Sequence, residues 1–199
     1  MIDTHAETSQ DRRPGIVICA YDPLACDWDL AEDLSGQIWN PAGARTIAVP
    51  AGEPSDLVAA LSRHLSDAEC RGLLLVGPNR YSSLFRIQMR AENRGLEPGS
   101  APLHQSPSIA RATAPAAGMV QALHDIGLSA DATSDGEEDV GSYLLYRVLC
   151  ALPEGRDVPS VGLLRVPEDT EAALVEQAIK AVAGVIAQHM SPLPRARHI

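Results

Sequence analysis

The stretch Gly141-Ser142-Tyr143-Leu144-Leu145-Tyr146-Arg147-Val148-Leu149-Cys150 is an apolar run without proline that follows an acidic loop at residues 134–139. It predicts a helix of roughly residues 140–152. Side-chain oxygens of the loop can accept the N–H groups that the first turn of a helix leaves unbonded. Acidic groups there also suit the positive end of the helix dipole. The fold then depends on the segments on either side of this helix.

Short apolar segments recur before and after the predicted helix. Because they lack polar alternation, they are typical of strands that are buried on both faces. They cover residues 15–20, 44–49, 71–77, 128–133 and 160–166. Apolar residues at helical spacing predict further helices at 27–37, 54–65, 116–126 and 168–189. In the last helix the predicted buried face consists of Leu174, Ala178, Ile179, Val182 and Ile186.

Two segments are harder to assign. In residues 85–93, Phe85, Ile87 and Met89 alternate with polar residues, which favours a strand. Residues 94–115 are rich in proline and glycine and are predicted to form a long loop. A loop of this length in a compact domain is usually functional or mobile.

The alternation of strands and helices predicts an α/β fold, a three-layer α/β/α sandwich with a mostly parallel central sheet. One domain at residues 15–190 is expected, flanked by a disordered tail at 1–14 and a second tail at 191–199. Ligands in such folds bind beyond the carboxyl ends of the strands. The loops to consider are therefore 20–27, 77–84, 134–141 and 165–169.

Composition excludes several function classes. The formal net charge of −10 argues against nucleic acid and anionic membranes as partners. No apolar run approaches the roughly 20 residues of a membrane span, and the polar N-terminus does not read as a secretory signal. Cys19, Cys26, Cys70 and Cys150 lack metal-site spacing, so we expect free buried thiols in a cytoplasmic protein, with no metal and no cofactor.

Six stretches carry a resemblance to a known family, in this order along the chain. They are Ala20-Tyr21-Asp22-Pro23-Leu24, Val49-Pro50, Ile87-Gln88-Met89-Arg90-Ala91-Glu92-Asn93, Leu123 to Ala130, Val140 to Tyr146, and Gly162-Leu163-Leu164-Arg165-Val166-Pro167. They resemble motifs of the pyroglutamyl peptidases (pyrrolidone-carboxylate peptidases), a family of cysteine peptidases. The resemblance implies the phosphorylase/hydrolase-like α/β fold of that family over nearly the whole domain.

The same resemblance implies a degenerate active site. In the family a cysteine attacks the amide bond after an N-terminal pyroglutamate, a histidine activates the thiol, and a glutamate completes the site. The matching positions hold Leu145, Arg165 and Gln88. Leucine has no nucleophilic atom, arginine stays protonated near neutral pH, and glutamine does not titrate. The aromatic residues that hold the substrate ring correspond to Tyr21 and Leu24.

A relocated nucleophile is an alternative. Ser142 lies about 60° from Leu145 around the helix, and Cys26 lies in the first site loop. Either would need a base, for which His104 in the long loop is the candidate. Cys150 lies about 140° from Leu145 around the helix, so we expect it to be a buried structural thiol.

Arg165 also leaves two possibilities open. A cation at the edge of a parallel sheet can hold a carboxylate or another small anion. It can instead pair with Asp135, Glu137, Glu138 or Asp139 of the acidic loop, and this pairing is favoured.

We therefore expect a non-catalytic interaction or regulatory subunit that binds a protein partner or self-associates, with a small anionic ligand in the pocket as a further possibility. The alternative is a diverged cysteine- or serine-type amidase or peptidase.

Overall fold

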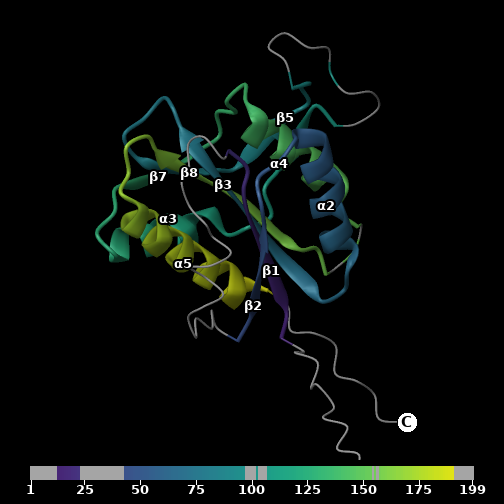
Figure 1. Ribbon diagram of the computed structural model, residues 1–199, viewed down its shortest axis with the longest axis horizontal. Coiled ribbons are helices and arrows are strands. Elements are labelled where there is room, and N and C mark those ends of the chain that lie inside the picture. The colour runs from purple at the N-terminus through teal and green to yellow at the C-terminus, as the bar shows by residue number, and fades with distance from the viewer. Residues whose placement is uncertain are drawn as a thin grey trace, which may run out of the picture.

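The computed structural model of the chain describes residues 13–22, 43–96, 102, 107–153, 155 and 157–190. The predicted helix at 27–37 and nearly all of both predicted tails lie outside these ranges. Within them, a central sheet carries two helices on each face, and a small two-stranded sheet lies beside it (Figure 1). The predicted three-layer α/β/α sandwich is therefore confirmed.

The central sheet has six strands in the order β2-β1-β3-β8-β4-β7. Their bounds are β1 (Gly15–Ala20), β2 (Arg45–Val49), β3 (Cys70–Asn79), β4 (Phe85–Gln88), β7 (Ala130–Thr133) and β8 (Ser160–Pro167). Every pairing is parallel except that of β4 with β8. The three strands β1, β3 and β8 are buried almost throughout, as the continuous apolar runs predicted.

The reversal of β4 and β7 changes where one predicted site loop begins. Gln88 of β4 lies opposite Thr133 of β7 on one side and Leu163 of β8 on the other. The acidic loop after Thr133 therefore starts at the level of Leu163, near the middle of β8. Strand β7 runs antiparallel to β8, so this loop does not begin at the edge of the sheet where β8 ends. It approaches the site over the face of the sheet instead.

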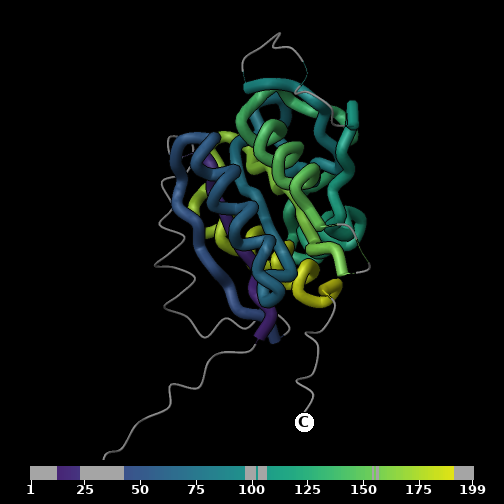
Figure 2. The backbone as a smooth tube through the Cα atoms, turned by 90° about the vertical axis from the view of Figure 1, so that its right-hand side faces the viewer, coloured from purple at the N-terminus to yellow at the C-terminus, as the bar shows by residue number. Residues whose placement is uncertain are grey.

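The helices lie in two layers. One face carries α2 (Pro54–Ser66) and α4 (Val140–Cys150), and Figure 2 looks onto this face. The other face carries α3 (Ala116–Asp125) and α5 (Ala172–His189). Each helix layer packs on the sheet through a separate cluster of mainly aliphatic side chains. Burial of this apolar area is the main stabilising term.

The last helix begins later than predicted, at Ala172. Asp169 has φ 64°, outside the helical region, and the Thr170 hydroxyl donates to the Pro167 carbonyl at 2.7 Å. This turn ends β8 before the helix starts. The buried face also differs by one position, because Val175 is 1% exposed and Leu174 is 37% exposed.

The predicted strand at residues 85–93 is divided between the two sheets, with β4 in the central sheet and β5 (Arg90–Glu92) in the small one. β5 pairs with β6 (Ile109–Arg111), a strand that lies inside the predicted loop. Ala91 and Ala110 lie opposite each other, and both are buried in the cluster that contains α4 residues. Chain segments far apart in sequence thus meet around the start of α4.

Candidate functional site

A buried arginine on β8 is the centre of the candidate site. Arg165 is 0% exposed and has the largest volume among the fully buried side chains that the structure describes. It lies opposite Gly77 of β3 and Arg86 of β4. A buried cation is stable only with nearby negative charge and an acceptor for each N–H group.

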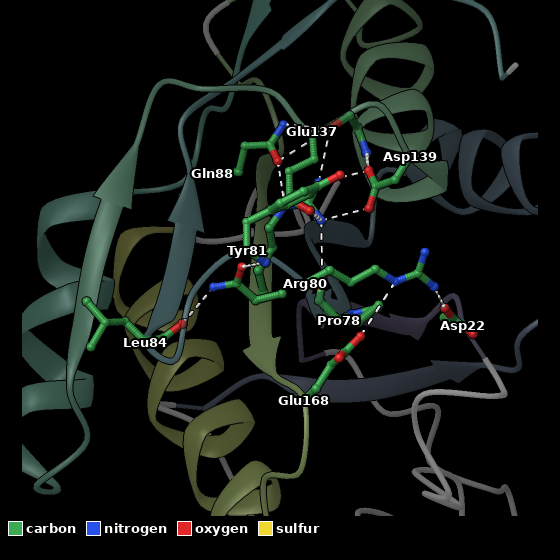
Figure 3. A network of polar contacts seen from close by, with 12 residues as sticks. Asp22, Pro78, Arg80, Tyr81, Leu84, Gln88, Glu137, Asp139 and Glu168 are labelled. Atoms are coloured by element: carbon green, nitrogen blue, oxygen red, sulfur yellow. Dashed lines mark hydrogen bonds and ion pairs between the residues drawn. The ribbon is translucent and has the colours of Figure 1, made fainter. Parts of the chain in front are cut away.

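Two of the guanidinium nitrogens bind side chains from different elements (Figure 3). Nε donates to Oε1 of Gln88 at 2.7 Å. Nη2 donates to Oδ1 of Asp139 at 2.9 Å and to Oγ of Ser142 at 3.0 Å. The guanidinium therefore joins β4, the acidic loop and the first turn of α4.

The third nitrogen has more acceptors than hydrogens. Nη1 of Arg165 donates to Oδ2 of Asp139 at 2.8 Å and to Oε2 of Glu137 at 3.1 Å, with the Pro78 carbonyl at 3.3 Å. All five N–H groups of the guanidinium therefore have acceptors within the protein. Of the two possibilities left open for Arg165, pairing with the acidic loop is the one seen, through Asp139 and Glu137.

Asp139 has two structural roles. Its Oδ1 accepts the backbone N–H of Ser142 at 2.9 Å, which makes Asp139 the N-cap of α4. Both its oxygens also bind Arg165. Burial alone would raise the pKa of Asp139, but the hydrogen bonds and charge of Arg165, with the Ser142 N–H, lower it below its ordinary value.

Glu137 is held less firmly. It makes one contact with Arg165, and burial raises its pKa although the charge of Arg165 opposes this. The neighbouring Glu138 instead forms an ion pair with Arg94, outside the buried cluster. Gly136 lies over the site, because a Cβ there would stand 3.9 Å from Nε2 of Gln88. The acidic loop thus covers Gln88 and Arg165.

Gln88 and Ser142 complete the polar cluster. The Gln88 side chain is 0% exposed, and its Nε2 donates to the Arg90 carbonyl at 2.8 Å and to Ser142 Oγ at 3.1 Å. Ser142 is 7% exposed. The side chains of Gln88, Arg165 and Asp139 all hydrogen-bond the Ser142 hydroxyl. Gln88 and Arg165 are not bases, and Asp139 is a weak one because its pKa is lowered by Arg165.

Solved structures of pyroglutamyl and pyrrolidone carboxyl peptidases share this arrangement of strands and helices. Pyroglutamyl peptidase I from Bacillus amyloliquefaciens superposes with TM-score 0.74 at 16% identity, covering 92% of this chain and 100% of that one. Pyrrolidone carboxyl peptidase from Thermus thermophilus superposes with TM-score 0.67 at 16% identity, covering 85% of this chain and 98% of that one. A mutant pyrrolidone carboxyl peptidase from Pyrococcus furiosus superposes with TM-score 0.72 at 17% identity, covering 89% of this chain and 100% of that one.

The chain has the pyroglutamyl peptidase fold. No family model matches the sequence, and no curated protein matches it either. At 14–17% identity the likeness lies in the backbone arrangement. The resemblance implied this fold, and the superposition over nearly the full length of each peptidase confirms it.

In this pyroglutamyl peptidase fold, Leu145 belongs to the hydrophobic core. It is 0% exposed and lies in the cluster between the sheet and α4, with Leu144 and Val148 of the same helix. Ser142, one turn earlier, reaches the polar cluster around Arg165. The start of α4 is therefore polar where it meets Arg165 and apolar from the next turn onward.

Tyr21 fills the space between β3 and α4. Its ring lies so close to two glycines that a Cβ on Gly77 would stand 2.0 Å from Cζ, and a Cβ on Gly141 would stand 2.2 Å from the hydroxyl oxygen. Tyr21 is 4% exposed. The predicted pocket residue Tyr21 thus lies beside the site, and Leu24 lies outside the described residues.

The candidate relocated nucleophiles have different environments. Cys150 is exposed at the end of α4, so the prediction of a buried thiol there was wrong. Leu145 faces the core, and a side chain about 140° further around the helix points to solvent instead. Cys19 and Cys70 are buried as predicted, and burial raises the pKa of Cys19 to about 12. Cys26 and His104 lie outside the described residues.

The described residues give little sign of other kinds of site. They contain no group of three or more His, Cys, Asp or Glu side chains placed to hold a metal ion. No helix among them is long and apolar enough to span a membrane. His124 of α3 binds the Ala130 carbonyl through Nε2 at 2.9 Å.

Two contributors to the site were not predicted from the sequence. The Pro78 carbonyl binds Arg165, and no residue pattern could have identified a backbone acceptor. Arg80 forms ion pairs with Asp22 at 3.4 Å and Glu168 at 3.7 Å, joining the ends of β1, β3 and β8 (Figure 3). Its position in a predicted site loop was the available signal.

Proposed function

We propose that this chain is a non-catalytic protein built on the pyroglutamyl peptidase fold. In this proposal Leu145, Arg165 and Gln88 occupy the positions of the cysteine, the histidine and the glutamate. The observation that carries it is the closed set of hydrogen bonds around Arg165. Burial alone would lower the pKa of Arg165, but Asp139 raises it above its ordinary value. The group at the position of the base therefore stays protonated.

The rival proposal is a diverged amidase or peptidase with a relocated nucleophile. For Ser142 the surroundings argue against it, because Arg165 and Gln88 both donate hydrogen bonds to the hydroxyl oxygen, and the neighbouring carboxylate of Asp139 has a lowered pKa and is paired with Arg165. A nucleophilic hydroxyl instead needs a neighbour that accepts its proton. The pairing of Cys26 with His104 stays a prediction.

A protein without catalytic groups acts through binding, so we propose the role of an interaction or regulatory subunit in the cytoplasm. Its partner is another protein or a second copy of the chain. The net charge of −10 supports a protein partner over nucleic acid or an anionic membrane. A small anionic ligand at Arg165 is a further part of the proposal, and it is developed below.

Hydrolysis of pyroglutamyl aminomethylcoumarin tests the proposal. We expect the purified protein to release no more fluorophore than buffer, and the Ser142→Ala and Cys26→Ala variants to behave identically. Release that either substitution abolishes would overturn the proposal and establish the rival. Light scattering after size-exclusion chromatography, with and without extract from the source cell, tests the interaction role. A monomer that gains no partner of fixed stoichiometry would count against that role.

A further inference from the structure

The two carboxylates that neutralise Arg165 are bound unequally. Asp139 makes two parallel hydrogen bonds, at 2.8 and 2.9 Å, and its Oδ1 also accepts the Ser142 N–H. Glu137 makes a single hydrogen bond of 3.1 Å, to Nη1 alone. Bidentate pairs are the stronger and more directional kind. Asp139 is therefore the fixed counter-ion of Arg165, and Glu137 is the weaker one.

Departure of either carboxylate would have different consequences for the buried donors. Without Asp139, N–H groups on both Nη1 and Nη2 and the backbone N–H of Ser142 would each lose an acceptor. Without Glu137, the second N–H of Nη1 would keep the Pro78 carbonyl at 3.3 Å. An unsatisfied buried donor is costly. Removal of Glu137 alone avoids that cost.

Glu137 is also placed where it can leave. Its side chain is 11% exposed, while that of Arg165 is fully buried, so Glu137 lies on the solvent side of the pair. Burial raises the pKa of Glu137 despite the charge of Arg165, so Arg165 offsets only part of the cost of burying the ionised carboxylate. Gly136 precedes it and allows the chain more conformations than other residues would.

From these contacts we propose that the Nη1 side of Arg165 is a binding site for a small carboxylate ligand. Glu137 occupies this site as an internal substitute when no ligand is present. An external carboxylate displaces Glu137 and takes its hydrogen bond, while Asp139 stays in place. This inference rests on the proposed non-catalytic role of the site, and it names the class of ligand that the site takes.

Acetate is the probe, measured by thermal unfolding of the full chain at pH 7, with sodium chloride replaced by sodium acetate at constant ionic strength. Binding to the folded state raises the melting temperature in a saturable way. In wild type only molecules whose Glu137 has moved away can bind. We therefore expect a midpoint roughly tenfold higher in acetate for wild type than for Glu137→Ala. Glu137→Gln, which keeps the shape of the side chain, should have an intermediate midpoint.

Glu138→Ala is the matched control, because it removes a charge from the same loop without touching Arg165. Its response to acetate should equal that of wild type. The inference is overturned if wild type and Glu137→Ala respond to acetate as they do to chloride, or if Glu138→Ala binds as tightly as Glu137→Ala. The same preparations are assayed for pyroglutamyl hydrolysis. Turnover there would overturn the proposed function independently of the acetate result.

Discussion

Asp139 accepts hydrogen bonds from Arg165 through both carboxylate oxygens, at 2.8 and 2.9 Å, and the same Asp139 caps helix α4 by accepting the N–H of Ser142. One side chain therefore joins the end of the acidic loop, the start of a helix and a strand of the central sheet. The position of α4 and the neutralisation of the buried cation depend on each other for this reason.

Replacing Asp139 by asparagine should lower the free energy of unfolding by about 3 kcal/mol, because Arg165 loses its bidentate carboxylate and Glu137 is then its one carboxylate partner among the described residues. Asparagine preserves the ability to cap the helix, so the loss reports on the ion pair. Urea unfolding followed by circular dichroism measures it. Asp135→Asn is the control, since Asp135 is exposed and should change stability by less than about 0.5 kcal/mol. Equal losses in the free energy of unfolding for Asp139→Asn and Asp135→Asn would contradict the prediction.

Replacing Arg165 by alanine should leave a cavity lined by Gln88, Glu137 and Asp139, with two carboxylates unpaired. We expect a loss of about 3–5 kcal/mol. Low concentrations of guanidinium chloride should then raise the melting temperature of this variant, because the ion can bind where the side chain was. The same concentrations should lower the melting temperature of wild type. Urea, which has a similar shape and no charge, serves as the control, and rescue by urea alone would exclude ion-specific binding.

Gly77 and Gly141 are required by the ring of Tyr21. Alanine at either position should destabilise the protein by about 1–3 kcal/mol or more, because the new methyl group would overlap the ring. The cost should fall sharply when Tyr21→Ala is introduced as well, which a double-mutant cycle measures. Gly52→Ala is the control, since a Cβ there meets no atom within 4 Å. Additive effects of the glycine and tyrosine substitutions would contradict the proposed contact.

The two acids of the site should affect acid stability in opposite directions. Because the folded-state pKa of Asp139 is below its ordinary value of 3.8, its stabilisation is complete above that value and is lost as the pH falls through the lowered pKa. Glu137 has a pKa above its ordinary value of 4.5, so its protonation on acidification favours the folded state.

In a series of unfolding measurements from neutral to acidic pH, Asp139→Asn should therefore flatten the decline in stability. Glu137→Gln should make the decline steeper. Identical pH profiles for the two variants would contradict this assignment.

The sequence predicted most of the secondary structure because local patterns specify it. The apolar runs of β1, β3 and β8 and the amphipathic spacing of α2 need no tertiary information. Residues 109–111 were missed, because a three-residue strand has no periodicity of its own and depends on pairing with β5. The start of α5 was placed too early because the backbone of Asp169 is fixed by a local turn.

For the candidate site, the sequence by itself singled out Gln88, Ser142 and Arg165 and four acidic residues as their possible neighbours. It could not choose among Asp135, Glu137, Glu138 and Asp139, because one residue step along a loop changes the direction of a side chain. The tertiary structure decided that choice. The reversed direction of β4 and β7 brings the loop over the face of the sheet, and the N-cap of α4 fixes Asp139 against Arg165. Charges that the sequence only lists become a buried network because strands from distant parts of the chain place them together.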